Sequence, residues 1–226
     1  MRLPTPESTA PAALPGLDFE LALWDAGCTR VAGIDEAGRG ALAGPVAAAA
    51  VILPADPALR QVLSGVRDSK QMTPRQRSYW AQVIRQTAVT YAVGYADCQE
   101  IDTLGIVPAT RLAVLRALQA LTLAPQHLLL DWLLLPECDL PQTSLAKGDQ
   151  RVLSIAAASV LAKTGRDCLL QELDAAYPGY GLKDHKGYGT AHHLASLQHL
   201  GPSPLHRLTF SPMHALEPGG NHDQPS

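Results

Sequence analysis

The stretch "TRVAGIDEAGRGALAGPVAAAAVIL", residues 29–53, places two apolar segments on either side of a glycine-rich loop. Residues 29–36 and 46–53 are short and rich in β-branched residues or alanine, which predicts two buried neighbouring strands. The first segment ends in adjacent carboxylates, Asp35 and Glu36, and like charges this close repel each other unless something compensates them. The pair is therefore either a strand end that reaches solvent or part of a site that binds a cation.

Alternating strands and helices are predicted for the rest of the chain. Apolar residues at helical spacing, with Ser or Thr as candidate N-caps, indicate helices, and short apolar or alternating runs indicate strands. The predicted strands are residues 89–97 and 127–136. The predicted helices run from Pro74, after a Thr73 cap, to about Ala88, over 107–121, from a Ser154 cap to Tyr177, and between Thr190 and Gly201.

The composition indicates one substantial core. A chain of 226 residues with 46% hydrophobic residues can form one large domain. The longest uncharged run, residues 41–54, is interrupted by Gly44 and Pro45 and is shorter than the roughly 20 apolar residues of a membrane-spanning helix. We therefore expect no membrane segment. The amino terminus lacks the basic start and apolar core of a signal peptide, which favours a disordered lead-in.

The cysteines are far apart in the sequence, and no C-x-x-C pair suggests a zinc or redox site. Free thiols in a reducing cytoplasm are the simplest account, so we expect a cytoplasmic protein. The cysteines are Cys28, Cys98, Cys138 and Cys168.

The net charge gives no general indication of nucleic-acid binding. The formal charge is −3 and the sequence pI is about 6.2, whereas nucleic-acid binders are often strongly basic. The carboxyl-terminal part of the chain nevertheless holds a group of basic residues that could form a local basic groove, and six of the eight histidines lie from His185 to His214. The basic residues are Lys147, Arg151, Lys163, Arg166, Lys183, Lys186 and Arg207.

Two further carboxylates stand out by their surroundings. Asp131 lies in a run of leucines, where an ionised carboxylate must be protonated, paired or bound to a cation. Asp149 precedes the helix predicted to start at Ser154, and it is either an anion favoured by that helix terminus or a plain loop residue. If Asp35 and Asp131 lie on neighbouring strands, the carboxylates converge, and oxygen-only sites of this kind suit magnesium or manganese.

Such a site would explain both the paired carboxylates and the loop that follows them. Two divalent ions about 4 Å apart can activate a water on one side of a phosphodiester and stabilise the leaving oxygen on the other. Glycines after the carboxylates let the backbone approach a phosphate or sugar closely. No Ser/His/Asp or Cys/His arrangement offers a protein nucleophile. We therefore expect in-line attack by water, which leaves a 3′-hydroxyl and a 5′-phosphate.

The segment "GIDEAGRGALAGPV" resembles the signature of ribonuclease HII, the bacterial type 2 ribonuclease H. Five more segments are similar and follow in the order of that family: "DSKQMTPRQR", "EIDTLGI", "KGDQRVLSIAAASVLAK", "YPGYGLKDHKGYGTAHH" and "LGPSPLHRLTF". The resemblance implies a ribonuclease H-like α/β fold, with a mixed β-sheet flanked by helices and a helical carboxyl-terminal part. It covers about residues 20–212, which leaves residues 1–19 and 213–226 as a disordered lead-in and tail.

The same resemblance implies an activity and a set of metal ligands. The enzyme would be a monomeric endonuclease that cleaves RNA in RNA/DNA hybrids, including single ribonucleotides embedded in duplex DNA. The family usually has glycine after its strand aspartate and often asparagine near residue 105, where this chain has Trp132 and Gly105. The catalytic residues, which would bind Mg²⁺ or Mn²⁺, are Asp35, Glu36, Asp131 and Asp149.

Substrate contacts follow from the same motifs. Gly38, Arg39 and Gly40 match the loop that reads the 2′-hydroxyl of the ribonucleotide and the flanking phosphate, and that hydroxyl distinguishes RNA from DNA. Tyr188 matches a tyrosine that packs on the following deoxyribose, which would let the enzyme sense an RNA-to-DNA junction.

Several basic and polar residues are candidate contacts to nucleic acid. Asp68, Ser69 and Lys70 match the D-S-K motif of the family, and they are either nucleic-acid contacts or a loop cap. Loss of any candidate phosphate contact should weaken binding broadly. These candidates are Lys147, Lys183, Lys186 and Arg207.

Other conspicuous pairs have ordinary explanations as well. Lys163 and Asp167 are four residues apart on the longest predicted helix, and they form either an exposed intrahelical pair or part of the site. His192 and His193 lie near a helix start without a metal-like partner at i, i+4, so we expect them to be exposed to solvent.

Two other functions agree less well with the sequence. The loop "GRGALAG" has the spacing G-x-G-x-x-x-G, is followed by Pro45, and lacks an acidic residue about 20 positions later, which argues against a dinucleotide-binding oxidoreductase. A nucleic-acid-binding module of the same fold without catalysis would be expected if a ligand carboxylate were missing. Because the sequence retains all of these carboxylates, a catalytic protein is favoured.

Overall fold

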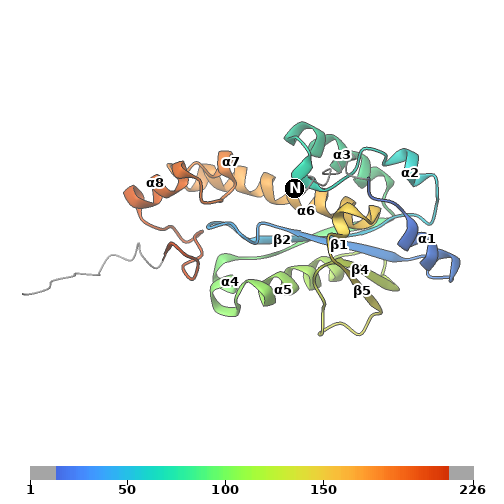
Figure 1. Cartoon of the computed structure of the whole chain (residues 1–226). Coiled ribbons are helices and arrows are strands. Elements are labelled where there is room, and N and C mark those ends of the chain that lie inside the picture. The colour runs from blue at the N-terminus through green and yellow to red at the C-terminus, as the bar shows by residue number, and fades with distance from the viewer. Residues whose placement is uncertain (1–13, 214–226) are drawn as a thin grey trace, which may run out of the picture.

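The computed structural model describes residues 14–213, and its centre is a five-stranded sheet (Figure 1). The order across the sheet is β3, β2, β1, β4 and β5, with β1 antiparallel to β2 and parallel to β4. The sheet is therefore mixed, as predicted. The strands are β1 (Val31–Ala37), β2 (Val46–Ile52), β3 (Thr90–Ala96), β4 (His127–Asp131) and β5 (Gln142–Leu145).

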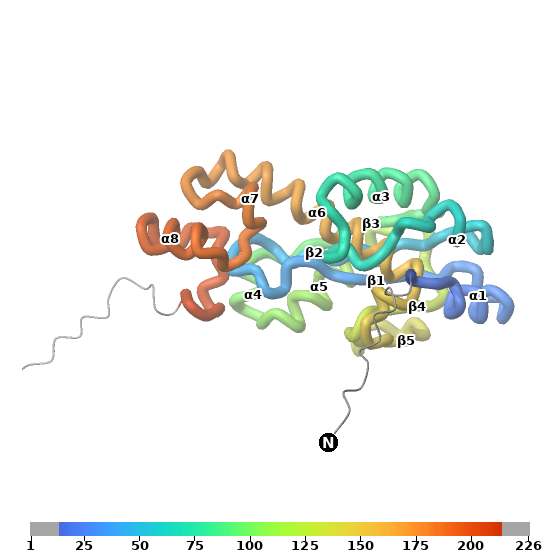
Figure 2. The backbone as a smooth tube through the Cα atoms, turned by 45° about the horizontal axis from the view of Figure 1, so that its top comes forward, coloured from blue at the N-terminus to red at the C-terminus, as the bar shows by residue number. Residues whose placement is uncertain are grey.

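Helices cover both faces of the sheet. In Figure 1, α3 and α6 lie on one face, α4 and α5 lie on the other, and α7 and α8 extend beyond the end of the sheet. Figure 2 shows α6 running from the sheet to this helical carboxyl-terminal part. The helices are α1 (Asp18–Asp25), α2 (Leu59–Val62), α3 (Pro74–Thr87), α4 (Cys98–Leu104), α5 (Ile106–Gln119), α6 (Leu153–Ala176), α7 (Leu182–His185) and α8 (Ala191–Leu200).

The core lies on both sides of β2, in which every residue is buried. Ala49 and Val51 pack with α3 and α6, whereas Ala48 and Ala50 pack with α5. A strand covered on both faces reads as a continuous apolar run, which is why this segment was recognisable in the sequence. None of the helices formed by residues 14–213 is both long enough and apolar enough to cross a membrane.

Two predicted helix starts are confirmed in detail. The Thr73 hydroxyl accepts the N–H of Gln76, and the Gln76 side chain accepts the N–H of Thr73, so that a capping box precedes Pro74. Thr190 caps α8 through the N–H of His193.

The prediction that Ser154 caps the longest helix is wrong. α6 begins at Leu153, whose N–H donates to the carbonyl of Gly16, and the N–H of Ser154 donates to the carboxylate of Glu20 at 2.8 Å. The amino-terminal segment thus caps α6 from outside the helix. Gly16 forms a parallel β-bridge with Val152, and Leu17 is buried. The folded region therefore begins before residue 20, which was the predicted boundary. The remaining parts of the predicted lead-in and tail, residues 1–13 and 214–226, lie outside the described residues.

The strand predicted over residues 127–136 is too long. β4 ends at Asp131 because Trp132 has a φ of 45°, which no extended strand can accommodate. Leu133 and Leu135 are buried on the α5 side of the core, although they belong to a loop. The sequence also gave no indication of β5, since its residues Gln142–Leu145 are mostly polar and only half-buried.

Candidate active site

Asp35 and Asp131 occupy adjacent parallel strands, which meets the condition on which the predicted site depends. Ile34 of β1 pairs with Leu130 of β4, and each carboxylate comes one residue later on its strand. Asp35 lies on the face covered by α6, because a Cβ at Gly33, two residues earlier, would lie 2.2 Å from the backbone of α6. Only glycine permits this approach, and the approach brings the start of α6 beside both carboxylates.

Asp149 reaches the same region from the turn that precedes α6. This turn is a short 3₁₀ helix, Gly148–Gln150, and the N–H of Gly148 donates to Oδ1 of Asp131 at 2.8 Å. Asp149 is only 3% exposed. The structure therefore brings together the carboxylates of Asp35, Asp131 and Asp149 around the start of α6, with Glu36 at the end of β1.

The carboxylates act strongly on one another. Burial, and then the neighbouring charge of Glu36, hold the pKa of Asp35 well above its ordinary value, and Asp131 raises it further. Burial raises the pKa of Asp149 to about 6, and the carboxylates of Asp68 and Asp131 add to this effect. Grouping these carboxylates in the folded chain therefore opposes folding near neutral pH.

The donor set matches a hard divalent cation. Carboxylate oxygens are the ligands that Mg²⁺ and Mn²⁺ prefer. Among the described residues, Glu36 is the one predicted ligand with an ion pair, to Arg39 at 3.3 Å. Within residues 14–213, no group of three or more His, Cys, Asp or Glu side chains is already closed into a metal-binding cluster. The chemistry of the donors fits the ion, and the side chains would have to close on it.

Asp68 is an additional acidic residue at this site. Its carboxylate accepts the N–H of Lys70 at 2.9 Å and caps a short turn, which confirms the loop-cap interpretation. Burial lowers the pKa of Lys70, but Asp68 and the carboxylates of the site outweigh this effect and raise it. Ser69 is buried and hydrogen-bonds to Ser159, and its contact with substrate stays a prediction. Lys70 stays a candidate contact.

The glycine loop follows directly from Glu36. Gly38 has a φ of 89°, and a Cβ there would lie 2.0 Å from Nε of Arg166, so no other residue fits. Gly40 has open space where a side chain would be, which leaves its backbone accessible. The side chain of Arg39 is 37% exposed beside Glu36. These features suit close approach of a sugar or phosphate to the backbone.

Two buried arginines hold this loop, and we call Arg166 and Arg207 the buried arginine pair. Both are 0% exposed, and both donate only to backbone carbonyls in the hydrogen bonds of residues 14–213. The prediction of Arg207 as a phosphate contact is therefore wrong. The carbonyl acceptors belong to Gly38, Arg39, Ala43, Gly44, Pro45 and Lys186.

Tyr188 lies beside this loop, although it is distant in sequence. The carbonyl of Gly187 accepts the N–H groups of Leu42 and Ala43, which join the two segments. The Tyr188 side chain is 37% exposed, and the guanidinium of Arg166 lies 5.7 Å from its ring centre. The structure thus brings Tyr188 to the same edge as Gly38, Arg39 and Gly40.

Histidines support the segment that carries Tyr188. His193 is fully buried and stacks on His185. Its Nδ1–H donates to the Tyr188 carbonyl at 3.0 Å, and its Nε2 shares a hydrogen bond with Nε2 of His206. The prediction of exposure is therefore correct for His192 and wrong for His193. Burial, with the neighbouring His193, lowers the pKa of His206 to about 4, which keeps this ring neutral at physiological pH.

A groove of about 580 Å³ leads away from Tyr188 between α3, α6 and α7. The Lys163–Asp167 pair is present at 2.6 Å, but it is largely buried in this groove and shares Asp167 with Arg77. Of the two alternatives for this pair, the exposed one is therefore wrong. Lys147 lies elsewhere, on an exposed turn directly before Gly148. The basic residues that line the groove are Arg77, Lys163, Lys183 and Lys186.

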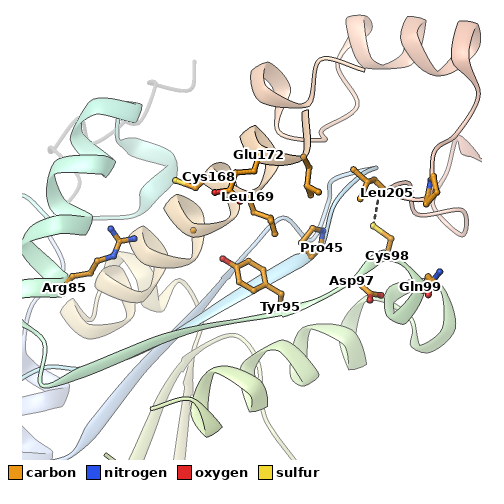
Figure 3. Close-up of a pocket in the computed structure, with 13 residues that line it drawn as sticks. Pro45, Arg85, Tyr95, Asp97, Cys98, Gln99, Cys168, Leu169, Glu172 and Leu205 are labelled. Atoms are coloured by element: carbon orange, nitrogen blue, oxygen red, sulfur yellow. Dashed lines mark hydrogen bonds between the residues drawn. The ribbon is translucent and has the colours of Figure 1, made fainter. Parts of the chain in front are cut away.

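A second cavity, of about 780 Å³, lies between α6, the end of β3 and the loop at Leu205 (Figure 3). The thiol of Cys98 donates to the carbonyl of Leu205 there at 2.8 Å. None of the predicted metal ligands lines this cavity. It is therefore separate from the carboxylates.

Sequence comparison identifies the family. The profile described as Ribonuclease HII matches residues 32–213. Ribonuclease HII from Synechococcus sp. (strain JA-3-3Ab) is 55% identical over 207 residues, which cover 91% of this chain and 92% of the relative. Among solved structures, ribonuclease H2 from Pyrococcus horikoshii OT3 is similar with a TM-score of 0.67 at 26% identity, over 83% of this chain and 97% of the other. Bst-RNase HIII in complex with Mn²⁺ has the same fold, with a TM-score of 0.62 at 20% identity over 83% of this chain and 68% of the other. The chain therefore belongs to the ribonuclease HII family and is an endonuclease with ribonuclease H activity.

Proposed function

We propose that this enzyme hydrolyses the RNA strand of RNA/DNA hybrids and cuts on the 5′ side of single ribonucleotides embedded in duplex DNA. The products would carry 3′-hydroxyl and 5′-phosphate ends. The observation that carries the proposal is a group of carboxylates near the start of α6, followed directly along β1 by an open glycine loop. The carboxylates suit two-metal hydrolysis of a phosphodiester, and the open loop suits recognition of a sugar hydroxyl.

Asp35, Glu36, Asp131 and Asp149 would hold Mg²⁺ or Mn²⁺. When bound, two such ions activate a water for attack and stabilise the leaving oxygen. The fold shared with Bst-RNase HIII, whose structure contains Mn²⁺, supports this choice of ions. The carboxylates themselves supply negative charge that is not balanced by any ion pair of Asp35, Asp131 or Asp149 in residues 14–213. That imbalance favours cation uptake.

Recognition of the ribonucleotide would depend on the loop at Gly38–Gly40 and on Tyr188. The buried arginine pair fixes the loop carbonyls, so that the neighbouring N–H and C=O groups can meet a 2′-hydroxyl without rearranging. Arg39 offers a guanidinium for the flanking phosphate. The exposed ring of Tyr188 offers an apolar face on which the next deoxyribose would pack.

The nucleic acid would continue along the basic groove, where Lys186 begins the path beside Tyr188. Lys70 and Lys147 would contact the backbone near the scissile phosphate. We also propose that the enzyme acts as a cytoplasmic monomer, and the free state of its four cysteines agrees with a reducing compartment.

The first experiment is a denaturing-gel assay with duplex DNA that carries one ribonucleotide, in Mg²⁺, in Mn²⁺ and in a chelator. An all-DNA duplex controls for general nuclease activity. Asp131→Asn tests the ligand set, and Asp25→Asn, which changes an exposed carboxylate on α1, is the matched control. We expect ion-dependent cutting 5′ of the ribonucleotide by the wild-type enzyme and by Asp25→Asn only.

Two results would contradict the proposal. Wild-type activity of folded Asp131→Asn would exclude this aspartate as a ligand. Failure of the folded wild-type protein to cut with either ion would instead indicate the nucleic-acid-binding module without catalysis. Arg39→Ala tests the loop separately, because an unchanged preference for the ribonucleotide would remove Arg39 from recognition.

A further inference from the structure

Trp132, the residue directly after Asp131, has a conformation that its residue type disfavours. Its φ of 45° lies in the left-handed region, where a bulky side chain is strained. Trp132 is 36% exposed, so burial of this residue in the core does not explain the conformation. Such strain persists where surrounding contacts require it, and it is common at functional sites.

The contacts of Trp132 are with two residues of the candidate active site. The indole N–H points between the two carboxylate oxygens of Glu36, at 2.9 and 3.1 Å from Nε1. The guanidinium of Arg39 lies over the indole ring, 3.8 Å from its centre, and Nη1 of Arg39 is 3.3 Å from Glu36. The three side chains therefore contact one another in a closed triangle. An extended backbone at this position would direct the indole elsewhere.

We propose that Trp132 is a positioning residue that orients the carboxylate of Glu36 for a divalent cation and orients Arg39 for the substrate. This inference rests on the proposed function, since it concerns the same ions. A carboxylate offers about four lone-pair positions. The indole N–H of Trp132 and the guanidinium of Arg39 do not occupy all lone-pair positions of the Glu36 carboxylate. Glu36 can therefore bind a cation while its carboxylate stays hydrogen-bonded to Trp132. Hydrogen bonds to metal ligands of this kind typically change metal affinity or activity by about 10- to 100-fold.

A purely structural role for Trp132 predicts something different. Glycine adopts a φ of 45° without strain, so Trp132→Gly should lose little stability, although it removes both contacts. If the residue served only the fold, neither metal affinity nor substrate affinity would change in a folded variant. Two substitutions separate the two contacts. Trp132→Phe keeps an aromatic ring for Arg39 but has no N–H for Glu36, whereas Trp132→Gly lacks both.

The test is a titration of the metal-free enzyme with Mn²⁺, followed by calorimetry or by the resonance signal of free Mn²⁺. We expect Trp132→Phe and Trp132→Gly to bind Mn²⁺ about 10-fold more weakly than the wild type. At saturating Mn²⁺, the KM for the ribonucleotide-containing duplex should stay near the wild-type value in Trp132→Phe and rise in Trp132→Gly. Trp24→Phe is the matched control, because the indole N–H of Trp24 has no hydrogen-bond partner among the described residues.

The outcomes separate this inference from the proposed function. If the wild type binds Mn²⁺ and folded Trp132→Phe binds it equally or more tightly, the orienting role of Trp132 is wrong and the metal site stands. If the wild type and Asp35→Asn both fail to take up Mn²⁺, the proposed metal site is wrong, and the role of Trp132 is wrong with it. If Trp24→Phe bound Mn²⁺ as weakly as the Trp132 variants do, the effect would come from a general loss of packing, and the inference would also be wrong.

Discussion

Two groups of like charges lie largely inside this protein, and their surroundings differ: both arginines of one group are fully buried, whereas the other group joins the buried Asp35 and Asp149 with the half-buried Asp131. The buried arginine pair donates each of its hydrogen bonds to a backbone carbonyl of the loop or of Lys186. The carboxylates of Asp35, Asp131 and Asp149 have no cationic partner among the ion pairs of the described residues. A buried charged side chain whose hydrogen bonds all go to the backbone holds that backbone in place. A buried charge that the fold leaves unmatched is available for a ligand.

The buried arginines and the carboxylates also differ in how their charge depends on pH. Burial lowers the pKa of Arg207 to about 10, and the neighbouring Arg166 contributes to this shift, but the guanidinium stays charged at neutral pH. Burial raises the pKa of Asp149 to about 6, which brings its titration close to neutral pH. The arginines therefore keep a constant charge, whereas the charge of the carboxylate group depends on pH and on bound cations.

The largest expected effect is on activity. Asp131→Asn should reduce the single-turnover cleavage rate by about 10³-fold, because a lost ligand removes several kcal/mol of transition-state stabilisation. Without divalent ions, the same variant should unfold at an equal or higher urea concentration than the wild type, since one of the repelling charges is gone. The Gly148 N–H can still donate to an amide oxygen at this position. If Asp131→Asn were both active and less stable than the wild type, Asp131 would serve the fold, as the buried arginine pair does, and would not be a metal ligand.

The opposite outcome is expected for the buried arginine pair. Arg207→Met should lower the free energy of unfolding by about 3 kcal/mol, because the carbonyls of Gly38, Arg39 and Gly44 lose their donor. Urea unfolding measures this change. Arg75→Met, at an exposed position of α3, should change it by less than about 0.5 kcal/mol. Equal stability of Arg207→Met and the wild type would show that the loop does not need its buried cation.

The two groups were not equally predictable from the sequence. Asp131 stood out because a carboxylate inside a run of leucines demands a partner. That its strand lies next to β1 was only a condition of the predicted site, and the structure meets this condition. The burial of Arg207 gave no such signal. It depends on the folding of residues 38–45 around a side chain more than 160 residues later in the chain. Local sequence around an arginine does not contain that information.

Other errors have the same origin. Ser154 has the right residue type for an N-cap, but the carboxylate of Glu20 in α1 takes that role. His193 reads as an exposed residue near a helix start, and it is buried only because His185 and His206 pack around it. The capping box at Thr73 was predicted correctly because its contacts are local, whereas Ser154 and His193 were predicted wrongly because their contacts come from other segments of the chain.

An intermediate effect is expected on the pH dependence of stability. Because the pKa of Asp149 is about 6 in the folded chain and 3.8 in a model carboxyl, the folded chain binds this proton more tightly. Its stabilising contribution is complete below pH 3.8 and is lost as the pH rises to about 6.

The comparison with Asp149→Asn isolates this carboxyl from all other groups. In a chelator, the difference in unfolding free energy between variant and wild type should grow by roughly 2 to 3 kcal/mol between pH 4 and pH 7, in favour of the variant. Urea unfolding at several pH values measures it. Saturating Mn²⁺ should stabilise the wild type at pH 7 more than the variant. A difference that shrinks as the pH rises would mean that Asp149 is paired in the folded state.

The smallest effect is expected at Lys147, an exposed cation on the turn next to the carboxylates. Lys147→Asn removes the charge and keeps a residue type that tolerates the left-handed backbone, where φ is 55°. Binding to the ribonucleotide-containing duplex should weaken only a few-fold, because water screens an exposed charge. The slope of log affinity against log salt should fall by about 1, as for one lost phosphate contact. Arg60→Gln, on the remote helix α2, should leave the slope unchanged. A loss of cleavage as large as that of Asp131→Asn would mean that exposed cations, and not only buried unmatched carboxylates, carry the chemistry of this site.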